Sequence, residues 1–191
     1  MIHLNDPMES ERRKYEAMWA EPAYHQMSPG LEFVEVFVEV CKPTFAETLI
    51  DIGCGSGLAG VELARRGLQV TWTDLSDFTV DDVPAGRFIR APIYGDWSRA
   101  NKYGWDFGYC CDVMEHLPTE WTMLALDHVI RACRRSFFTI AHGPDQCGSL
   151  IGQSLHLTVQ PFTWWRDRIA QLGKLIEARD LCGRGLFVVH Q

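Results

Sequence analysis

From residue 48 onward, short apolar runs alternate with segments in which apolar residues recur at helical spacing. The apolar runs predict five strands, at 48–52, 69–74, 87–93, 105–113 and 136–142. The segments between them predict three helices, at 58–67 with Gly67 as C-cap, at 119–135, and at 163–173 with Thr163 as N-cap. Residues 174–181 and 186–191 complete the pattern as a hairpin across a Gly-Arg-Gly turn. This alternation predicts a parallel sheet covered on both faces, with one antiparallel edge strand.

The first forty residues have a different pattern, and we expect them to be helical from Asn5 to Val40. A capped helix is predicted to begin near Ser10, and Ser28–Gly30 breaks the chain after it. In the run LEFVEVFVEVC, 31–41, apolar residues alternate with glutamates, which is the period of a strand. Its length and the breaker before it favour a helix. We therefore expect one domain over 1–191, with 1–45 as an N-terminal helical lid or extension.

Composition narrows the class of protein. The chain has 191 residues, 47% of them hydrophobic, which suits one globular domain, and a formal charge of −7 argues against a nucleic-acid partner. Its seven cysteines include no C-x-x-C pair, so a reduced, cytoplasmic protein is expected. The polar N-terminus does not resemble a signal peptide, and no apolar run predicts a membrane span. A monomer or homodimer is the expected assembly.

The stretch LIDIGCGSGLAG, 49–60, places four glycines within eight residues, where a predicted strand passes into a helix. Such a loop brings backbone N–H groups and a helix N-terminus close to a ligand. A register through Gly55, Gly57 and Gly60 matches the dinucleotide fingerprint, but it puts its third glycine inside the helix. The register Gly53-Gly55-Gly57 begins where the strand ends, and Asp51 beside it would repel a pyrophosphate but attract an ammonium or sulfonium.

Two motifs together identify a family. DIGCGSG, followed by Asp74 at the end of the next strand, resembles the cofactor site of class I S-adenosylmethionine-dependent methyltransferases. WDFGYCCDVMEHLP, 105–118, is similar to the fourth-strand motif of their ubiquinone- and menaquinone-type subgroup. The resemblance implies a Rossmann-like α/β fold with a seven-stranded, mostly parallel sheet of order 3-2-1-4-5-7-6, strand 7 antiparallel, and helices on both faces. It implies S-adenosylmethionine as cofactor and S-adenosylhomocysteine as product.

The resemblance also implies roles for individual residues. The methionine portion of the cofactor would lie along Asp51, Gly53, Cys54, Gly55 and Gly57, and Cys111 and Asp112 would lie near the sulfonium. The adenosine portion would contact Asp74 through its ribose, Leu75 and Trp97 through its ring, and Asp96 through its amino group. His116 matches the family histidine that lies close to the transferred methyl group. One departure is the segment 75–86, whose acids and proline replace the usual amphipathic helix.

Three histidines are candidate bases for an oxygen or nitrogen acceptor, namely His116, His142 and His156, although each could instead be structural. Glu115 could act in catalysis or orient the helix that follows it. Phe162–Trp165 could line an acceptor pocket or belong to the core, where we also place Cys110. The aromatic residues near the N-terminus (Tyr15, Trp19 and Tyr24, with His25) form a lid over the cofactor or simply seat the first helix.

These observations favour methyl transfer to a small-molecule acceptor, such as a sugar or glycan, a lipid or another metabolite. The fourth strand carries neither the [DN]PP[YF] motif of base amino methylation nor the Pro-Cys of cytosine methylation, so nucleic acid is not the expected substrate. Two alternatives stay open: an NAD-dependent oxidoreductase, and a non-catalytic relative that serves as an interaction module. No metal is expected from the sequence.

Overall fold

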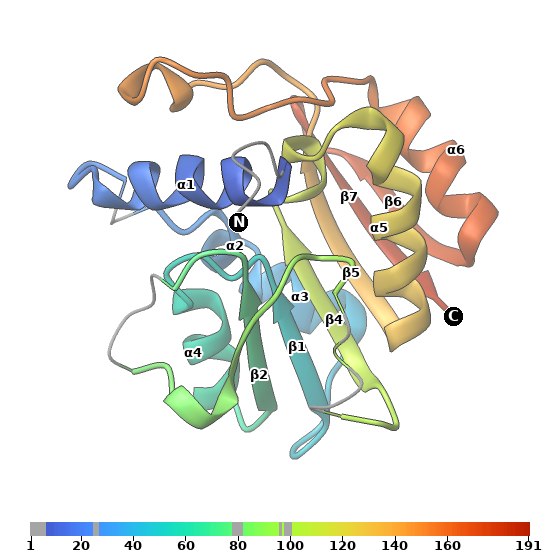
Figure 1. Ribbon diagram of the computed structural model, residues 1–191. Helices are drawn as coiled ribbons and strands as arrows, with labels where there is room; N and C mark the ends of the chain where they lie inside the picture. Colours follow the sequence, from blue (N-terminus) through green and yellow to red (C-terminus); the bar gives the residue numbers. More distant parts are fainter. Residues whose placement is uncertain (1–6, 25–26, 78–81, 96, 98–100) are drawn as a thin grey trace.

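A computed structural model shows a twisted seven-stranded sheet with helices on both faces (Figure 1). It describes residues 7–24, 27–77, 82–95, 97 and 101–191. The sheet order is β3-β2-β1-β4-β5-β7-β6, in which β7 pairs antiparallel with both neighbours and the other pairs are parallel. The strands are β1 Thr48–Ile52, β2 Gln69–Asp74, β3 Phe88–Arg90, β4 Trp105–Cys111, β5 Cys133–Ala141, β6 Lys174–Asp180 and β7 Arg184–His190. The predicted fold and strand order are confirmed.

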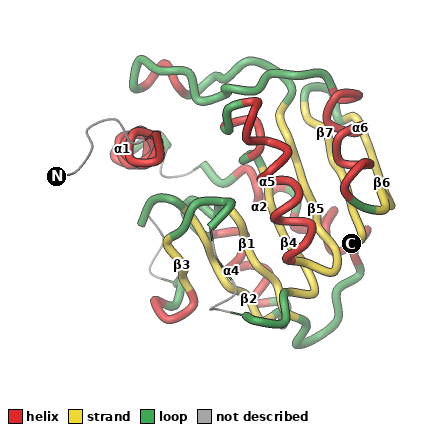
Figure 2. The backbone as a smooth tube through the Cα atoms, turned by 45° about the vertical axis from the view of Figure 1, so that its right-hand side comes forward, coloured by secondary structure: helices red, strands yellow, loops and turns green. Residues whose placement is uncertain are grey.

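The helices divide between the two faces of the sheet. The helical elements are α1 Pro7–Ala20, α2 Pro29–Glu32, α3 Val34–Cys41, α4 Leu58–Arg65, α5 Thr119–Ala132 and α6 Phe162–Leu172, with short 3-10 turns η1 Ala85–Arg87, η2 Met114–His116 and η3 Gly148–Leu150. One core cluster packs α3 and α4 on the sheet, and the other packs α5 and α6. The backbone views show helices on both sides of the sheet (Figures 1 and 2).

Alternation along each strand explains how one sheet feeds two cores. In β1, Leu49 belongs to the cluster under α3 and α4, whereas Ile50 and Ile52 belong to the cluster under α5 and α6. Successive side chains of a strand point to opposite faces, so strands buried on both sides become continuously apolar. The same alternation puts Asp51 on the α4 face, which decides what its carboxylate contacts.

Several predicted boundaries are wrong. The first helix begins at Pro7 rather than near Ser10, and the third strand is limited to Phe88–Arg90. The helix predicted over 119–135 ends at Ala132, because Cys133–Arg135 already pair with β4. Thr163 does not cap α6, which begins at Phe162 after an N-cap proline without a side-chain hydrogen bond. The run 31–41 is helical as expected, with a break at Phe33 between α2 and α3.

The N-terminal helix α1 lies across the carboxyl ends of the central strands (Figure 1). The long segment between β5 and α6 passes over the same end of the sheet, beyond α1. In open α/β sheets the carboxyl ends of the strands are where ligands bind. Among the described residues, no helix has both the length and the apolar character needed to cross a membrane.

Candidate functional site

The glycine loop leaves β1 and enters α4 with Gly53, Gly55 and Gly57 in the left-handed region, at φ of 63°, 53° and 81°. A side chain would be strained at each of these positions. A Cβ on Gly55 would also lie 2.6 Å from the Trp19 ring, so the loop backbone is in close contact with α1. Gly60 lies inside α4, where a Cβ would meet Trp72 Nε1 at 2.2 Å. Gly60 is therefore a packing contact between helix and sheet, as the Gly53-Gly55-Gly57 register requires.

Asp51 is directed from β1 toward the start of α4. Its Oδ2 accepts the Gly60 N–H at 3.0 Å, and the residue is 3% exposed. Burial raises the pKa of Asp51 to about 7, against the lowering effect of the Gly60 hydrogen bond. Asp51 nevertheless contributes to the wall of the cleft beside the glycine loop, where the resemblance places it.

Asp74, at the end of β2, holds the other side of the glycine loop. Its Oδ2 accepts the Gly55 N–H at 2.9 Å, and its Oδ1 accepts the N–H and the hydroxyl of Ser76 at 2.9 and 3.1 Å. Burial raises the pKa of Asp74, although these hydrogen bonds oppose the shift. The carboxylate lines the cleft and retains lone pairs that could accept from ligand hydroxyl groups.

The cleft at this end of the sheet has two connected parts. One is largely apolar and is lined by Asp74, Leu75 and the segment Ala91–Tyr94. The other is more polar and is lined by Asp51, Cys54, Cys111, the segment from Gly143 to Cys147, and Arg184. Gly53, Gly55, Asp112 and His116 border both parts. This division suits an elongated ligand with an apolar ring at one end and charged groups at the other.

Helix α1 covers the cleft. Trp19 and Tyr24 border both parts of it and contact each other with ring centroids 4.7 Å apart, while Tyr15 borders the apolar part. His25 lies outside the described residues. The aromatic residues weighed as a lid or as packing for the first helix thus border the site.

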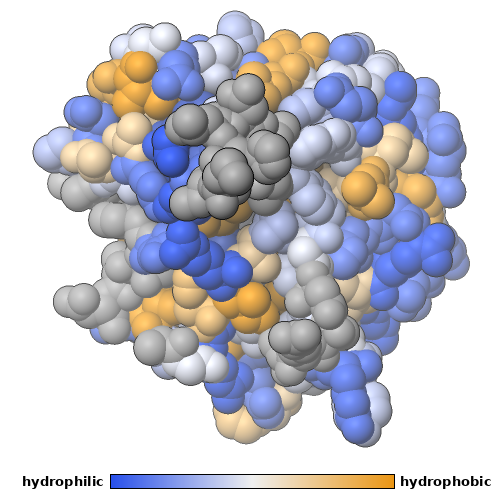
Figure 3. Space-filling model, in the orientation of Figure 1, coloured by the Kyte–Doolittle hydropathy of each residue, from blue (hydrophilic) through white to orange (hydrophobic). Residues whose placement is uncertain are grey.

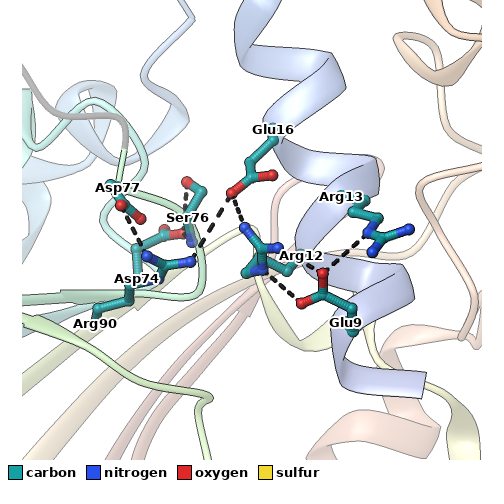
Figure 4. Close-up of polar contacts among 8 residues, drawn as sticks. All are labelled: Glu9, Arg12, Arg13, Glu16, Asp74, Ser76, Asp77 and Arg90. Carbon is teal, nitrogen blue, oxygen red and sulfur yellow. Dashed lines mark hydrogen bonds and ion pairs between the residues drawn. The ribbon is translucent and has the colours of Figure 1, made fainter. Parts of the chain in front are cut away.

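Ion pairs run along α1, and one of them reaches Arg90 at the edge of the sheet (Figure 4). Within the helix, Glu9 and Glu16 both pair with Arg12. Between elements, Arg90 of β3 lies 3.9 Å from Glu16 and 2.8 Å from Asp77, next to the Asp74–Ser76 turn. These groups are partly exposed, so solvent screening leaves each pair with little effect on stability. The space-filling view shows hydrophilic and hydrophobic side chains next to one another on this face of the molecule (Figure 3).

Residues at the end of β4 also line the cleft. Asp112 adopts the left-handed conformation at φ 55°, which aspartate tolerates better than most residues. Its Oδ2 forms an ion pair with Arg184 Nη2, and burial raises its pKa while Arg184 opposes the shift. Arg184 begins β7 and also lies over the Phe33 ring. Sequence reasoning did not single out Arg184, since 72 residues separate it from its partner.

Two of the three candidate histidines meet in the cleft. The rings of His116 and His156 are 4.9 Å apart and nearly perpendicular. Burial lowers the pKa of His116 to about 3, so its imidazole is neutral at pH 7. His142 lies apart, with Nε2 3.1 Å from Asp180, a residue of β6. The structure therefore brings together His116 and His156 but not His142.

Other expected site residues lie elsewhere. Trp97 packs in the core under α5, with its ring 4.6 Å from His128 and 6.4 Å from Trp105, and does not line the part of the cleft that holds Asp74. Asp96 lies outside the described residues. The Phe162–Trp165 segment also belongs to the core, where Trp165 is fully buried. Cys110 is buried as expected.

Glu115 does not cap α5. Its Oε1 accepts the Ala141 N–H at the end of β5, and its main-chain oxygen accepts N–H groups of Leu157 and Thr158. Sequence reasoning also missed the segment Ala91–Tyr94, which lines the apolar part of the cleft. Its signal was an apolar stretch directly after β3, at the same sheet edge as Asp74.

Comparison with known proteins agrees with this geometry. The chain has the fold of class I methyltransferases: magnesium protoporphyrin IX methyltransferase from Synechocystis PCC 6803, solved with bound SAH, superposes with a TM-score of 0.68 at 15% identity, over 97% of this chain and 100% of that one. No protein-family model matches the chain.

Sequence relatives are methyltransferases as well. The chain is 33% identical over 149 residues to ubiquinone biosynthesis O-methyltransferase of Nitrosomonas europaea, covering 68% of this chain and 57% of the relative. It is 32% identical over 102 residues to trans-aconitate 2-methyltransferase of Pseudomonas aeruginosa, covering 50% and 34%. The chain thus spans just over half of the length of the first of these relatives. The resemblance to class I S-adenosylmethionine-dependent methyltransferases is confirmed.

Proposed function

We propose that this protein transfers a methyl group from S-adenosylmethionine to a small-molecule acceptor. The observation that carries the proposal is the cleft in which the left-handed glycine loop, Asp74 and Asp112 meet at the carboxyl ends of three adjacent strands. In that cleft the adenine ring would lie between Leu75 and the Ala91–Tyr94 segment. The ribose hydroxyls would donate to Asp74, and the methionine portion would lie along Gly53–Gly57.

Methyl transfer is an in-line displacement, so the protein contributes chiefly by holding donor and acceptor in position. The acceptor would enter the polar part of the cleft, between the glycine loop and the segment that carries His156. His116 and His156 both reach this part, and His156 is the better placed of the two to take a proton from a hydroxyl or amino group, because burial lowers the pKa of His116 to about 3 and makes it a weak base. His142 has no such position. The acceptor would be a sugar or glycan, a lipid or another metabolite, and we expect residues 1–45 to act as the lid of a single domain.

Ligand binding provides the first test. S-adenosylhomocysteine should bind at micromolar levels in calorimetry, and NAD should give no thermal stabilisation. Asp74→Asn should weaken S-adenosylhomocysteine binding by about 10- to 100-fold, because hydrogen bonds to a charged group are worth about 1.5–3 kcal/mol. Asp77→Asn is the matched control, since Asp77 is an exposed acid three residues away.

Methyl transfer is then tested with labelled S-adenosylmethionine against pools of sugars, lipids and small carboxylic or phenolic metabolites. Label in a small-molecule fraction supports the proposal. Stabilisation by NAD in place of S-adenosylhomocysteine would favour the oxidoreductase. Tight S-adenosylhomocysteine binding without transfer to any pool would favour a non-catalytic relative.

The reducing compartment expected from the cysteines stays a prediction, with all seven present as free thiols.

A further inference from the structure

Three potential metal ligands converge beside the polar part of the cleft. Glu115 and His116 come from η2, and His156 comes from the segment between β5 and α6, some forty residues later in the chain. One ligand atom of each residue lies within 4.8 Å of those of the other two. A carboxylate with two imidazoles is a donor set that borderline metal ions such as Zn²⁺ prefer.

Both imidazoles are held by a hydrogen bond of the same ring nitrogen, Nδ1. Nδ1 of His116 lies 3.1 Å from the Leu155 carbonyl oxygen, and Nδ1 of His156 lies 2.8 Å from the Gly143 carbonyl oxygen. A carbonyl oxygen only accepts, so Nδ1 carries the proton in each ring and Nε2 carries the lone pair. A ring N–H that donates to a backbone carbonyl is the usual support of a metal-bound histidine, because it fixes both the tautomer and the ring orientation.

Glu115 also has one ligand atom held by the backbone and one without a hydrogen-bond partner among the described residues. Its Oε1 accepts the Ala141 N–H at 2.8 Å, whereas its buried Oε2 has no hydrogen-bond partner among the residues that the structure describes. The side chain is 0% exposed. A buried carboxylate oxygen without a partner is costly, and a cation at that oxygen would remove the cost.

The segment that carries His156 is fixed against η2. The N–H groups of Leu157 and Thr158 both donate to the Glu115 main-chain oxygen at 2.9 Å, and the Thr158 hydroxyl donates to the Leu117 oxygen at 2.7 Å. On the other side of His156, Asp145 accepts the Leu155 N–H at 2.8 Å. The three ligands are therefore positioned before any ion arrives.

We propose that Glu115, His116 and His156 bind one divalent first-row transition-metal ion through Glu115 Oε2 and the Nε2 atoms of both histidines. Ligands of a tetrahedral Zn²⁺ with bonds of about 2.1 Å lie about 3.4 Å apart. Closing the site from the present spacing thus needs side-chain movements on the order of 1 Å. Three protein ligands leave a position open, and the two imidazoles line the cleft, so that position faces the space proposed for the acceptor.

A catalytic role for the ion rests on the proposed function. With the Nε2 atoms of both histidines on the ion, neither would act as the base; an acceptor hydroxyl bound at the open position would instead lose its proton to solvent more readily. The oxygen would then form its bond to the methyl carbon as the bond from sulfur to that carbon breaks, releasing S-adenosylhomocysteine. Acceptors with an oxygen ligand, such as catechols or hydroxy acids, are the class that such a site would favour.

The test is calorimetric titration of the dialysed 191-residue chain with Zn²⁺, repeated with Co²⁺ while the visible absorption is recorded. We expect one equivalent to bind, with intense tetrahedral Co²⁺ bands and without the near-ultraviolet charge-transfer band that thiolate ligands would give. His156→Ala and Glu115→Gln should each weaken Zn²⁺ binding by at least about 100-fold. His142→Ala is the matched control, because that histidine ends outside the cluster, beside Asp180, and should bind Zn²⁺ as the parent does.

Equal Zn²⁺ affinity in the parent chain and in His156→Ala overturns the proposal, and so does a thiolate charge-transfer band. His156 lies outside the regular elements, so its replacement should fold even if Glu115→Gln does not; circular dichroism checks both variants. S-adenosylhomocysteine binding is measured on the same metal-free samples. Zn²⁺ binding without S-adenosylhomocysteine binding would remove the methyltransferase proposal and leave the metal site. S-adenosylhomocysteine binding without Zn²⁺ binding would remove only the metal site.

Discussion

Replacing Asp51 by asparagine should stabilise the ligand-free protein at alkaline pH and not at acid pH. The Asp51 carboxyl is 3% exposed, and its pKa rises from 3.8 to about 7 on folding, chiefly through burial. A group whose pKa is higher in the folded state contributes stability that is complete below the unfolded pKa and lost as pH rises through the folded pKa. For Asp51 the loss falls between about pH 4 and pH 7.

The size of the effect follows from the shift. Each pKa unit corresponds to about 1.4 kcal/mol, so the rise of roughly three units amounts to about 4 kcal/mol at pH 8. Asparagine keeps an oxygen that can accept the Gly60 N–H but has no proton to lose. The free energy of unfolding of Asp51→Asn, measured in urea, should therefore exceed that of the parent by up to about 4 kcal/mol at pH 8, and the difference should vanish near pH 4.

Asp106→Asn supplies a control of opposite sign. Burial acts to raise the pKa of Asp106, but hydrogen bonds from Thr48 and the ion pair with Arg134 outweigh it, so the pKa is lowered. The stability that Asp106 contributes is therefore present throughout pH 5–8. The free energy of unfolding of Asp106→Asn should be lower than that of the parent by the same amount at pH 5 and at pH 8. The reasoning would be refuted if Asp51→Asn lowered the free energy of unfolding by the same amount at every pH. Asp51 would then be a permanently charged partner of α4.

Two further substitutions test the packing around the site. Gly60→Ala should destabilise the protein by about 1–3 kcal/mol in urea unfolding, because its Cβ would meet Trp72 Nε1 at 2.2 Å; Gly86→Ala, with nothing within 4 Å, should change little. Trp165→Ala should cost about 3–5 kcal/mol, because the side chain is fully buried under the sheet, yet leave S-adenosylhomocysteine affinity intact. Lost affinity in a folded Trp165→Ala protein would instead place Trp165 at the ligand site.

The sheet was predictable because its signal is local and periodic. Most strands contain a short apolar run, and the Gly-Arg-Gly turn marks the hairpin that makes β7 antiparallel. The boundary between α5 and β5 was not predictable in this way. Cys133–Arg135 continue the helical pattern in sequence, but Cys133 pairs with Trp105 and Arg135 with Phe107 in the sheet. Pairing with a distant strand overrides the local preference, and a short window of sequence cannot reveal it.

The residues of the site also differ in whether local sequence could locate them. The glycine loop and Asp74 could be located because strand, loop and helix follow one another in the chain. Arg184 could not, because only the folded sheet brings β7 next to the end of β4. Trp97 shows the opposite failure: it follows β3 in sequence as an adenine-covering residue should, but its large apolar surface packs under α5 instead.

Electrostatics gives the strongest argument for the class of ligand. The carboxyl groups that line the cleft include those of Asp51, Asp74 and Asp112, and Arg184 forms an ion pair with Asp112. A pyrophosphate would bring negative charge to Asp51 and Asp74, which already have raised pKa values because of burial. An ammonium and a sulfonium would instead favour their charged forms. Binding of S-adenosylmethionine at pH 6–7 should thus release protons from the site, whereas binding of a dinucleotide should take them up. Calorimetry in two buffers of different ionisation enthalpy measures the sign directly.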